Sequence, residues 1–109
     1  MIIDFDTIPE VTIKNFRGGL NETVARIFSD DNGKIMHGSL KPGASIGFHK
    51  HETSSEIIYI LCGKGKVLYD DSTEELEAGM CHYCPKGHSH SLINDSKENL
   101  EFFAVVPEQ

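Results

Sequence analysis

The sequence predicts an all-β fold, a sandwich or barrel built from about nine short strands. Runs of β-prone residues alternate with turn signals roughly every ten residues along the chain. No stretch combines a sustained helical period of apolar residues with the capping residues that begin and end a helix. The chain has 109 residues and contains no internal repeat and no Pro/Ser/Gly-rich linker, so we expect a single domain over 1–109.

The first two predicted strands, 24–29 and 34–40, form a hairpin. Asn32 and Gly33 lie between them, and this pair is a strong hairpin signal because both central residues of such a turn accept positive φ. The second strand runs into Pro42 and the glycine after it, where proline presets the turn and glycine permits its tight second position. The further predicted strands are 45–49, 56–62, 66–69, 74–77, 80–84, 89–94 and 100–106.

Residues 57–62 form an apolar run that reads Ile-Ile-Tyr-Ile-Leu-Cys. A strand that is apolar on both faces is expected to be buried on both sides. One side can face the barrel core, and the other can face a second sheet or a partner subunit. The run therefore predicts a covered surface on each side of the strand.

The charge balance argues against nucleic acid and membrane partners. Seventeen acidic residues against ten basic ones give a formal net charge of −7, and only two of the basic residues are arginines, Arg17 and Arg26. A phosphate backbone or an anionic membrane surface requires clustered positive charge. No apolar run approaches the ~20 residues that cross a bilayer. We therefore expect neither partner and interpret the acidity as a solvated surface.

The N-terminus and the cysteines indicate a cytoplasmic location. Asp4 and Asp6 occur where a secretion signal would have a basic region followed by a long apolar stretch. The cysteines are Cys62, Cys81 and Cys84, and an odd number without a secretion signal argues against a disulfide framework. We therefore expect a cytoplasmic protein.

Four residues form a candidate mononuclear metal site: His49, His51, Glu56 and His90. Residues two apart on a strand point to the same face, so His49 and His51 can converge on one point. The polar segment 52–55 can turn the chain back and bring Glu56 from the neighbouring strand. His90 follows a Pro-Lys-Gly turn much later in the chain. Three imidazoles and a carboxylate suit divalent iron, manganese, nickel, cobalt, zinc or copper.

Two spaced frames surround these residues. The first, within 43–63, is Gly43-x5-His49-x-His51-x4-Glu56-x6-Gly63. The second, within 79–94, is Gly79-x5-Pro85-x-Gly87-x2-His90-x3-Asn94. Both frames reproduce the two motifs of the cupin superfamily without a departure, and so many specified positions coincide by chance with negligible probability. The chain therefore resembles a single-domain cupin over residues from about 34 to 106.

The resemblance implies a double-stranded β-helix, or jelly-roll barrel, with one divalent metal ion in its lumen and His49, His51, Glu56 and His90 as the ligands. Small cupins commonly dimerise, so we also expect a homodimer. Cupins include oxygenases, isomerases, lyases and decarboxylases, which implies an enzyme of one of these types that binds a small organic metabolite. A non-catalytic metabolite-binding or sensor cupin is the alternative, since fold alone does not determine function. A purely structural metal ion is a third interpretation.

A rival interpretation combines Cys81 and Cys84 with His88 and His90 in a zinc knuckle. The two cysteines are three apart on a predicted strand, which places them on opposite faces and argues against this arrangement. His88 then has two interpretations of its own. It either lines the mouth of the site as a base or is a solvated turn residue, and we favour the solvated position.

Three other residues lack a motif, and their orientation depends on strand register. His37 and His82 are expected to be hydrogen-bonded histidines of the barrel wall. Arg26 is a possible anchor for a carboxylate if it faces inward. The motif glycines are interpreted as turn residues, and Asn94 as a side chain that satisfies backbone groups near a strand end.

Overall fold

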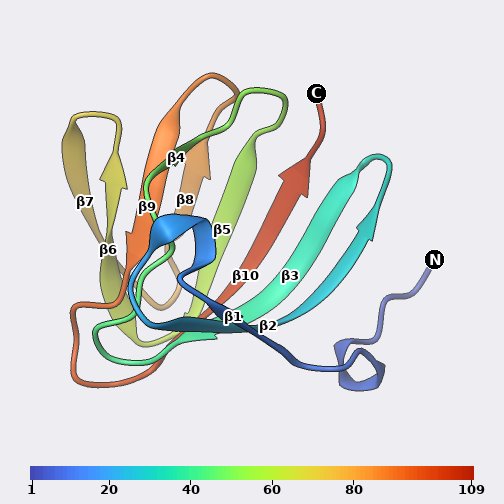
Figure 1. The fold of residues 1–109 in the computed structure, drawn as a ribbon, viewed down its shortest axis with the longest axis horizontal. Helices are drawn as coiled ribbons and strands as arrows, with labels where there is room; N and C mark the ends of the chain where they lie inside the picture. The colour runs from blue at the N-terminus through green and yellow to red at the C-terminus, as the bar shows by residue number, and fades with distance from the viewer.

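Ten strands in two facing sheets make up the fold, which the computed structural model describes for residues 1–109 (Figure 1). The larger sheet has the strand order β1-β2-β3-β10-β5-β8, and the smaller sheet has the order β4-β9-β6-β7. All of these pairings are antiparallel. The arrangement confirms the predicted all-β, jelly-roll class.

The bounds of the elements follow the turn signals of the sequence closely. The strands are β1 (Val11–Lys14), β2 (Glu22–Asp30), β3 (Gly33–Leu40), β4 (His49–Lys50), β5 (Glu56–Cys62), β6 (Lys64–Tyr69), β7 (Ser72–Glu77), β8 (Cys81–Cys84), β9 (Ser89–Ile93) and β10 (Leu100–Pro107). Two short 3-10 helices, η1 (Phe5–Thr7) and η2 (Phe16–Gly18), precede β2. None of the helices has the length and hydropathy of a membrane span.

The predicted strand 45–49 is wrong for most of its length. Ser45 makes an isolated bridge to β9, and a continuous ladder with β9 begins only at His49. The reason lies at Gly47, whose N–H donates to the carbonyl of Phe16 at 2.9 Å instead of to β9. The chain here bonds to η2, so β4 has only two residues.

Strand β1 has no counterpart among the predicted strands, because its four residues, Val-Thr-Ile-Lys, alternate over too short a length to indicate a strand. Three of its four residues are exposed. It lies at the edge of the larger sheet and pairs with β2 alone, for example Val11 opposite Ala25.

The predicted hairpin joins β2 and β3, but its turn lies one residue earlier than expected. Asp30 is paired with Gly33, so the two turn residues are Asp31 and Asn32. The Asp30 carboxylate accepts a hydrogen bond from the N–H of Asn32 at 2.9 Å. Gly33 has a φ of +139°, and the turn uses its freedom at the first position of β3.

The core lies between the two sheets and is centred on Phe102 of β10, which is fully buried. Gly38 of β3 is the cross-strand partner of Phe102. A β-carbon at Gly38 would lie 2.6 Å from the end of the Phe102 ring, so the missing side chain makes room for that ring. Asn94 fixes the chain nearby, because its amide donates to the carbonyls of Leu40 and Glu98 at 2.8 Å each.

Strand β5 is buried on one face only. Ile58 and Ile60 point into the core, whereas Ile57, Tyr59 and Leu61 are each about 40% exposed. The prediction that this strand is covered on both sides is therefore wrong for the chain by itself, because no second sheet packs on the outer face. That outer face is the surface on which a second copy would pack, and the homodimer stays a prediction.

Candidate metal centre

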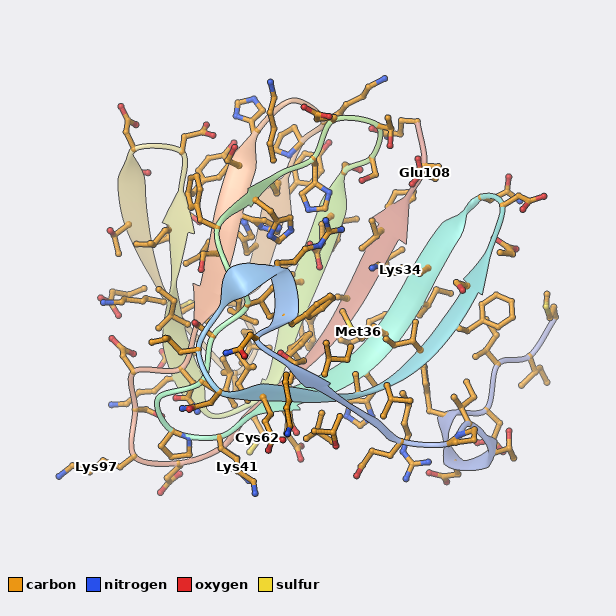
Figure 2. All side chains as sticks on the ribbon, in the orientation of Figure 1. Lys34, Met36, Lys41, Cys62, Lys97 and Glu108 are labelled. Carbon is orange, nitrogen blue, oxygen red and sulfur yellow. The ribbon has the colours of Figure 1, made fainter.

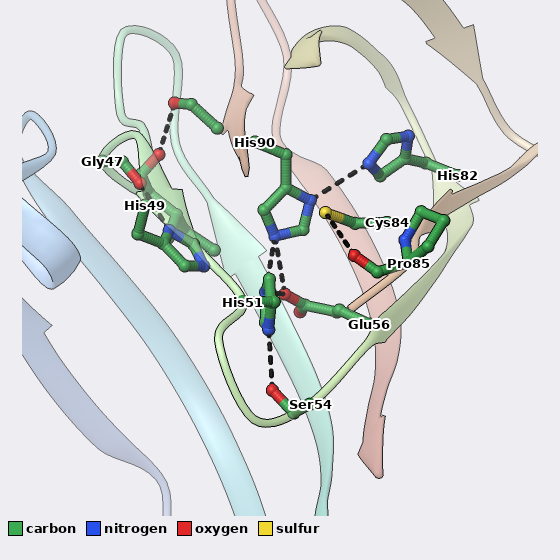
Figure 3. Close-up of polar contacts among 11 residues, drawn as sticks. Gly47, His49, His51, Ser54, Glu56, His82, Cys84, Pro85 and His90 are labelled. Atoms are coloured by element: carbon green, nitrogen blue, oxygen red, sulfur yellow. Dashed lines mark hydrogen bonds and ion pairs between the residues drawn. The ribbon is translucent and has the colours of Figure 1, made fainter. Parts of the chain in front are cut away.

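Both sheets contribute to one cluster of polar side chains inside the barrel (Figure 3). His49 of β4 and His90 of β9 are direct cross-strand partners, so their side chains share a face. His51 follows β4 by one residue, and Glu56 begins β5 in the opposite sheet. The ligand atoms that these four residues offer lie within 4.8 Å of one another.

Three atoms of the cluster form a tight triangle. Oε1 of Glu56 lies 3.0 Å from Nε2 of His51 and 2.9 Å from Nε2 of His90, and the two nitrogens are 2.9 Å apart. Ligands that bind one ion at about 2.1 Å and at right angles are themselves about 3.0 Å apart. The triangle and the donor types therefore fit a divalent transition metal ion.

The other ring nitrogen of each histidine is fixed by a partner outside the triangle. Nδ1 of His49 donates to the carbonyl of Gly47 at 2.7 Å, which leaves the Nε2 lone pair of His49 free. Nδ1 of His51 contacts Oγ of Ser54 at 2.8 Å, and Nδ1 of His90 contacts Nε2 of His82 at 3.0 Å. Such partners orient the ring, as metal sites require.

Burial and hydrogen bonding shift the pKa values at the site. Burial lowers the pKa of His49 to about 4, although the hydrogen bond to Gly47 acts in the opposite direction. For Glu56, burial by itself raises the pKa, but the close imidazoles of His51 and His90 outweigh it and lower the pKa to about 2. Neutral imidazole and ionised carboxylate are the forms that bind metals.

We expect the metal-free protein to lose stability as the pH falls from 7 to 4. Unfolded His49 takes up a proton near its ordinary pKa of 6.5, whereas folded His49, with a pKa of about 4, does not, so protons favour the unfolded chain in this window. The difference corresponds to about 3 kcal/mol, which the partial exposure of the ring reduces to about 1–2 kcal/mol. Thermal unfolding of chelator-treated protein measures it. A His49→Gln variant with the same pH dependence as the wild type would contradict this explanation.

The cysteines lie as strand parity predicts. Cys81 is exposed and Cys84 is buried, so they are on opposite faces of β8 and do not form a knuckle. Cys84 nonetheless lies near His82 and His90 in a second group that offers three ligand atoms. Burial raises the pKa of the Cys84 thiol to about 12, which keeps the thiol protonated.

Three histidines and an arginine outside the motifs lie in different places. His88 is partly exposed, and its Nδ1 contacts the carboxylate of Asp70 at 2.6 Å. His37 of β3 is on the opposite face from the core residues beside it. Arg26 donates to the carbonyls of Phe5 and Ile8, so it holds the N-terminal segment against β2. His82 is buried and contacts a residue of the cluster, which no motif indicated.

Two positive side chains, Arg17 and Lys34, line a cavity beside the site. A cavity of about 20 Å³ adjoins His49, His51 and Glu56 and is lined further by Phe16, Arg17, Lys34, Met36, Ile46 and Val106. Lys34 and Met36 come from the same strand, β3 (Figure 2), and Nζ of Lys34 lies 5.7 Å from the centre of the Phe16 ring. Sequence reasoning missed both cations, because Arg17 lies in an unpredicted turn and Lys34 has no motif.

Comparisons with known proteins agree with this fold. The cupin domain family matches residues 36–106, and the chain belongs to the cupin family. The oxalate-binding protein of Thermotoga maritima is 36% identical over 97% of this chain and 93% of its own length. A crystal structure described as a predicted oxalate decarboxylase, also from Thermotoga maritima, has a TM-score of 0.92, 31% identity and full coverage of both chains. The polyketide cyclase RemF of Streptomyces resistomycificus shares the fold, with a TM-score of 0.80, 23% identity and coverage of 98% and 78% of the two chains.

Proposed function

We propose that this cupin binds one divalent transition metal ion through His49, His51, Glu56 and His90 and, beside it, a small dicarboxylate of the oxalate class. The observation that carries the proposal is the convergence of four donor atoms next to a small cavity with positively charged lining residues. The relative named as an oxalate-binding protein supports the ligand class. When bound, the ion supplies a Lewis acid that attracts carboxylate oxygens.

The cavity lining supports a small, doubly charged ligand. Arg17 and Lys34 offer positive charge in a chain whose net charge is −7, so they attract an anion where most of the surface repels one. Met36, Ile46 and Val106 are apolar and reduce the access of water, which strengthens the attraction. The space beside the cluster is narrow, which favours a small ligand over a large metabolite.

The backbone of the Arg17 turn supports a binding role for that residue. Arg17 has a φ of +56° and Asn15 a φ of +50°, a left-handed conformation that costs on the order of 1 kcal/mol per residue. The hydrogen bond from Gly47 to Phe16 and that from Gly18 to Asn15 hold the turn in place. Strain that the fold maintains at a cavity is typical of a functional position.

Enzymatic turnover is a second candidate, supported by the description of the solved structure as a predicted oxalate decarboxylase. Cleavage of the carbon–carbon bond of oxalate releases carbon dioxide, and a proton must reach the remaining carbon to yield formate. Lys34 lines the cavity and carries such a proton. Glu56 is the one carboxyl group that lines the cavity, and it is a proposed metal ligand. The lining therefore offers no further carboxylate as a base, which favours binding over turnover.

Titration calorimetry with oxalate tests the proposal. Manganese-loaded protein is expected to bind oxalate, metal-stripped protein to bind it much more weakly, and Lys34→Gln to bind it about tenfold more weakly than the loaded wild type. Lys97→Gln is the matched control, because Lys97 is exposed and does not line the cavity. Oxalate binding that is unchanged by metal removal would contradict the proposal. Recovery of formate in place of oxalate would favour the enzyme.

A further inference from the structure

A chain of hydrogen bonds connects the cluster to the surface of the smaller sheet. Oε1 of Glu74 lies 2.8 Å from Nδ1 of His82, and Nε2 of His82 lies 3.0 Å from Nδ1 of His90. Both imidazoles are at most 4% exposed, whereas the side chain of Glu74 is 46% exposed. Figure 3 shows the His82 ring beside His90, on the opposite side of that ring from His51. The three residues come from β7, β8 and β9, which belong to both sheets.

The carboxylate of Glu74 determines which atom donates in each of these hydrogen bonds. An ionised carboxylate only accepts hydrogen bonds, so Nδ1 of His82 carries a hydrogen and donates it to Glu74. A neutral imidazole that donates from Nδ1 can only accept at Nε2. His90 must then donate from Nδ1, which leaves its Nε2 as a lone pair. Oε1 of Glu56, 2.9 Å from this Nε2, then takes its hydrogen from Nε2 of His51 instead. The two acceptors that face each other in the metal-free protein repel, and a cation between them relieves that repulsion.

The contact between the two ligand histidines agrees with this assignment of donors. Nε2 of His51 and Nε2 of His90 are 2.9 Å apart, and two nitrogens at that distance can share only one hydrogen. If the lone pair belongs to His90, the hydrogen in the metal-free protein belongs to His51. The hydroxyl of Ser54 can then donate to Nδ1 of His51, from which it lies 2.8 Å.

We propose that Glu74, acting through His82, sets the tautomer of His90, so that both are positioning residues which keep the Nε2 lone pair of His90 aimed at the metal centre. This inference rests on the proposed metal site but concerns a property of the metal-free protein. Glu74, at the surface, therefore determines whether the buried His90 presents the lone pair of its Nε2 to a metal ion. The negative charge also makes His90 a stronger donor to a cation.

Nitrogen-15 NMR of the metal-free protein tests the tautomer directly. In the wild type, His90 is expected to carry its hydrogen on Nδ1. In Glu74→Lys, the ammonium group donates to Nδ1 of His82, so His82 must donate from Nε2 and His90 must move its hydrogen to Nε2. Glu75→Lys is the matched control, because Glu75 is also exposed and makes the same change in charge on the other face of β7. It is expected to leave the tautomer of His90 unchanged.

Zinc affinity, measured by competition with a chromophoric chelator, supplies a second readout. Glu74→Lys is expected to weaken zinc binding about 10- to 100-fold, the range typical of groups that orient metal ligands. Glu74→Ala removes the acceptor without putting a donor in its place, so it should give a smaller loss of zinc affinity. Glu75→Lys should bind zinc as the wild type does.

Separate results decide the two proposals. A wild-type His90 with its hydrogen on Nε2, or a Glu74→Lys variant with the wild-type tautomer, would overturn the inference. A wild type that has the expected tautomer but binds no metal would overturn the proposed function and leave the assignment of the tautomer standing.

Discussion

Replacement of His90 by alanine is expected to weaken the binding of a divalent metal at least a hundredfold, or about 3 kcal/mol. His90 is 1% exposed, and its Nε2 lies within 3.0 Å of both Glu56 and His51, so its loss removes one ligand and a neighbour of two others. Competition between the protein and a chromophoric chelator for manganese or zinc measures the affinity.

His37→Ala is the control for this variant, because it removes an imidazole from the outward face of β3 and leaves the cluster intact. It should bind metal as the wild type does. Wild-type affinity in His90→Ala would contradict the four-ligand site. Circular dichroism of both variants without metal shows whether the fold is retained.

Replacement of Gly63 by alanine is expected to lower the free energy of unfolding by about 3 kcal/mol. Gly63 has a φ of +87°, which disfavours any side chain, and a β-carbon there would lie 2.4 Å from the carbonyl oxygen of Asn99. That oxygen belongs to the backbone, so it cannot swing aside as a flexible side chain would. Urea unfolding measures the loss.

Gly79→Ala separates the two causes of this loss. Gly79 has a similar φ of +93°, but a β-carbon there would meet nothing within 4 Å. It should therefore cost only the backbone strain, about 1 kcal/mol. Equal losses in the two variants would show that the contact with Asn99 is not important. Both glycines belong to the motif frames, and this comparison tests their interpretation as turn residues.

The sequence predicted what depends on local periodicity and spacing. Side-chain parity on a strand places His49 and His90 on one face once β4 and β9 pair, and it places Cys81 opposite to Cys84. The same reasoning failed at residues 45–49, because the bond from Gly47 to Phe16 comes from a distant turn that no local pattern records.

The remainder of the site depends on contacts between the sheets. His82 and Glu74 lie on different sheets, and their link to His90 follows from how the sheets face each other. Arg17 reaches the cavity through a left-handed turn, whereas Arg26, the arginine considered in the sequence as an anchor, holds the N-terminal segment. Neither position could be predicted without the three-dimensional fold.

We propose that one metal ion binds among His49, His51, Glu56 and His90. Anomalous diffraction from crystals of manganese-loaded protein tests it most directly. We expect a single peak within about 2.3 Å of Nε2 of the three histidines and of a carboxylate oxygen of Glu56. A peak between His82 and Cys84, or a well-ordered cluster without any peak in crystals grown with excess manganese, would contradict it.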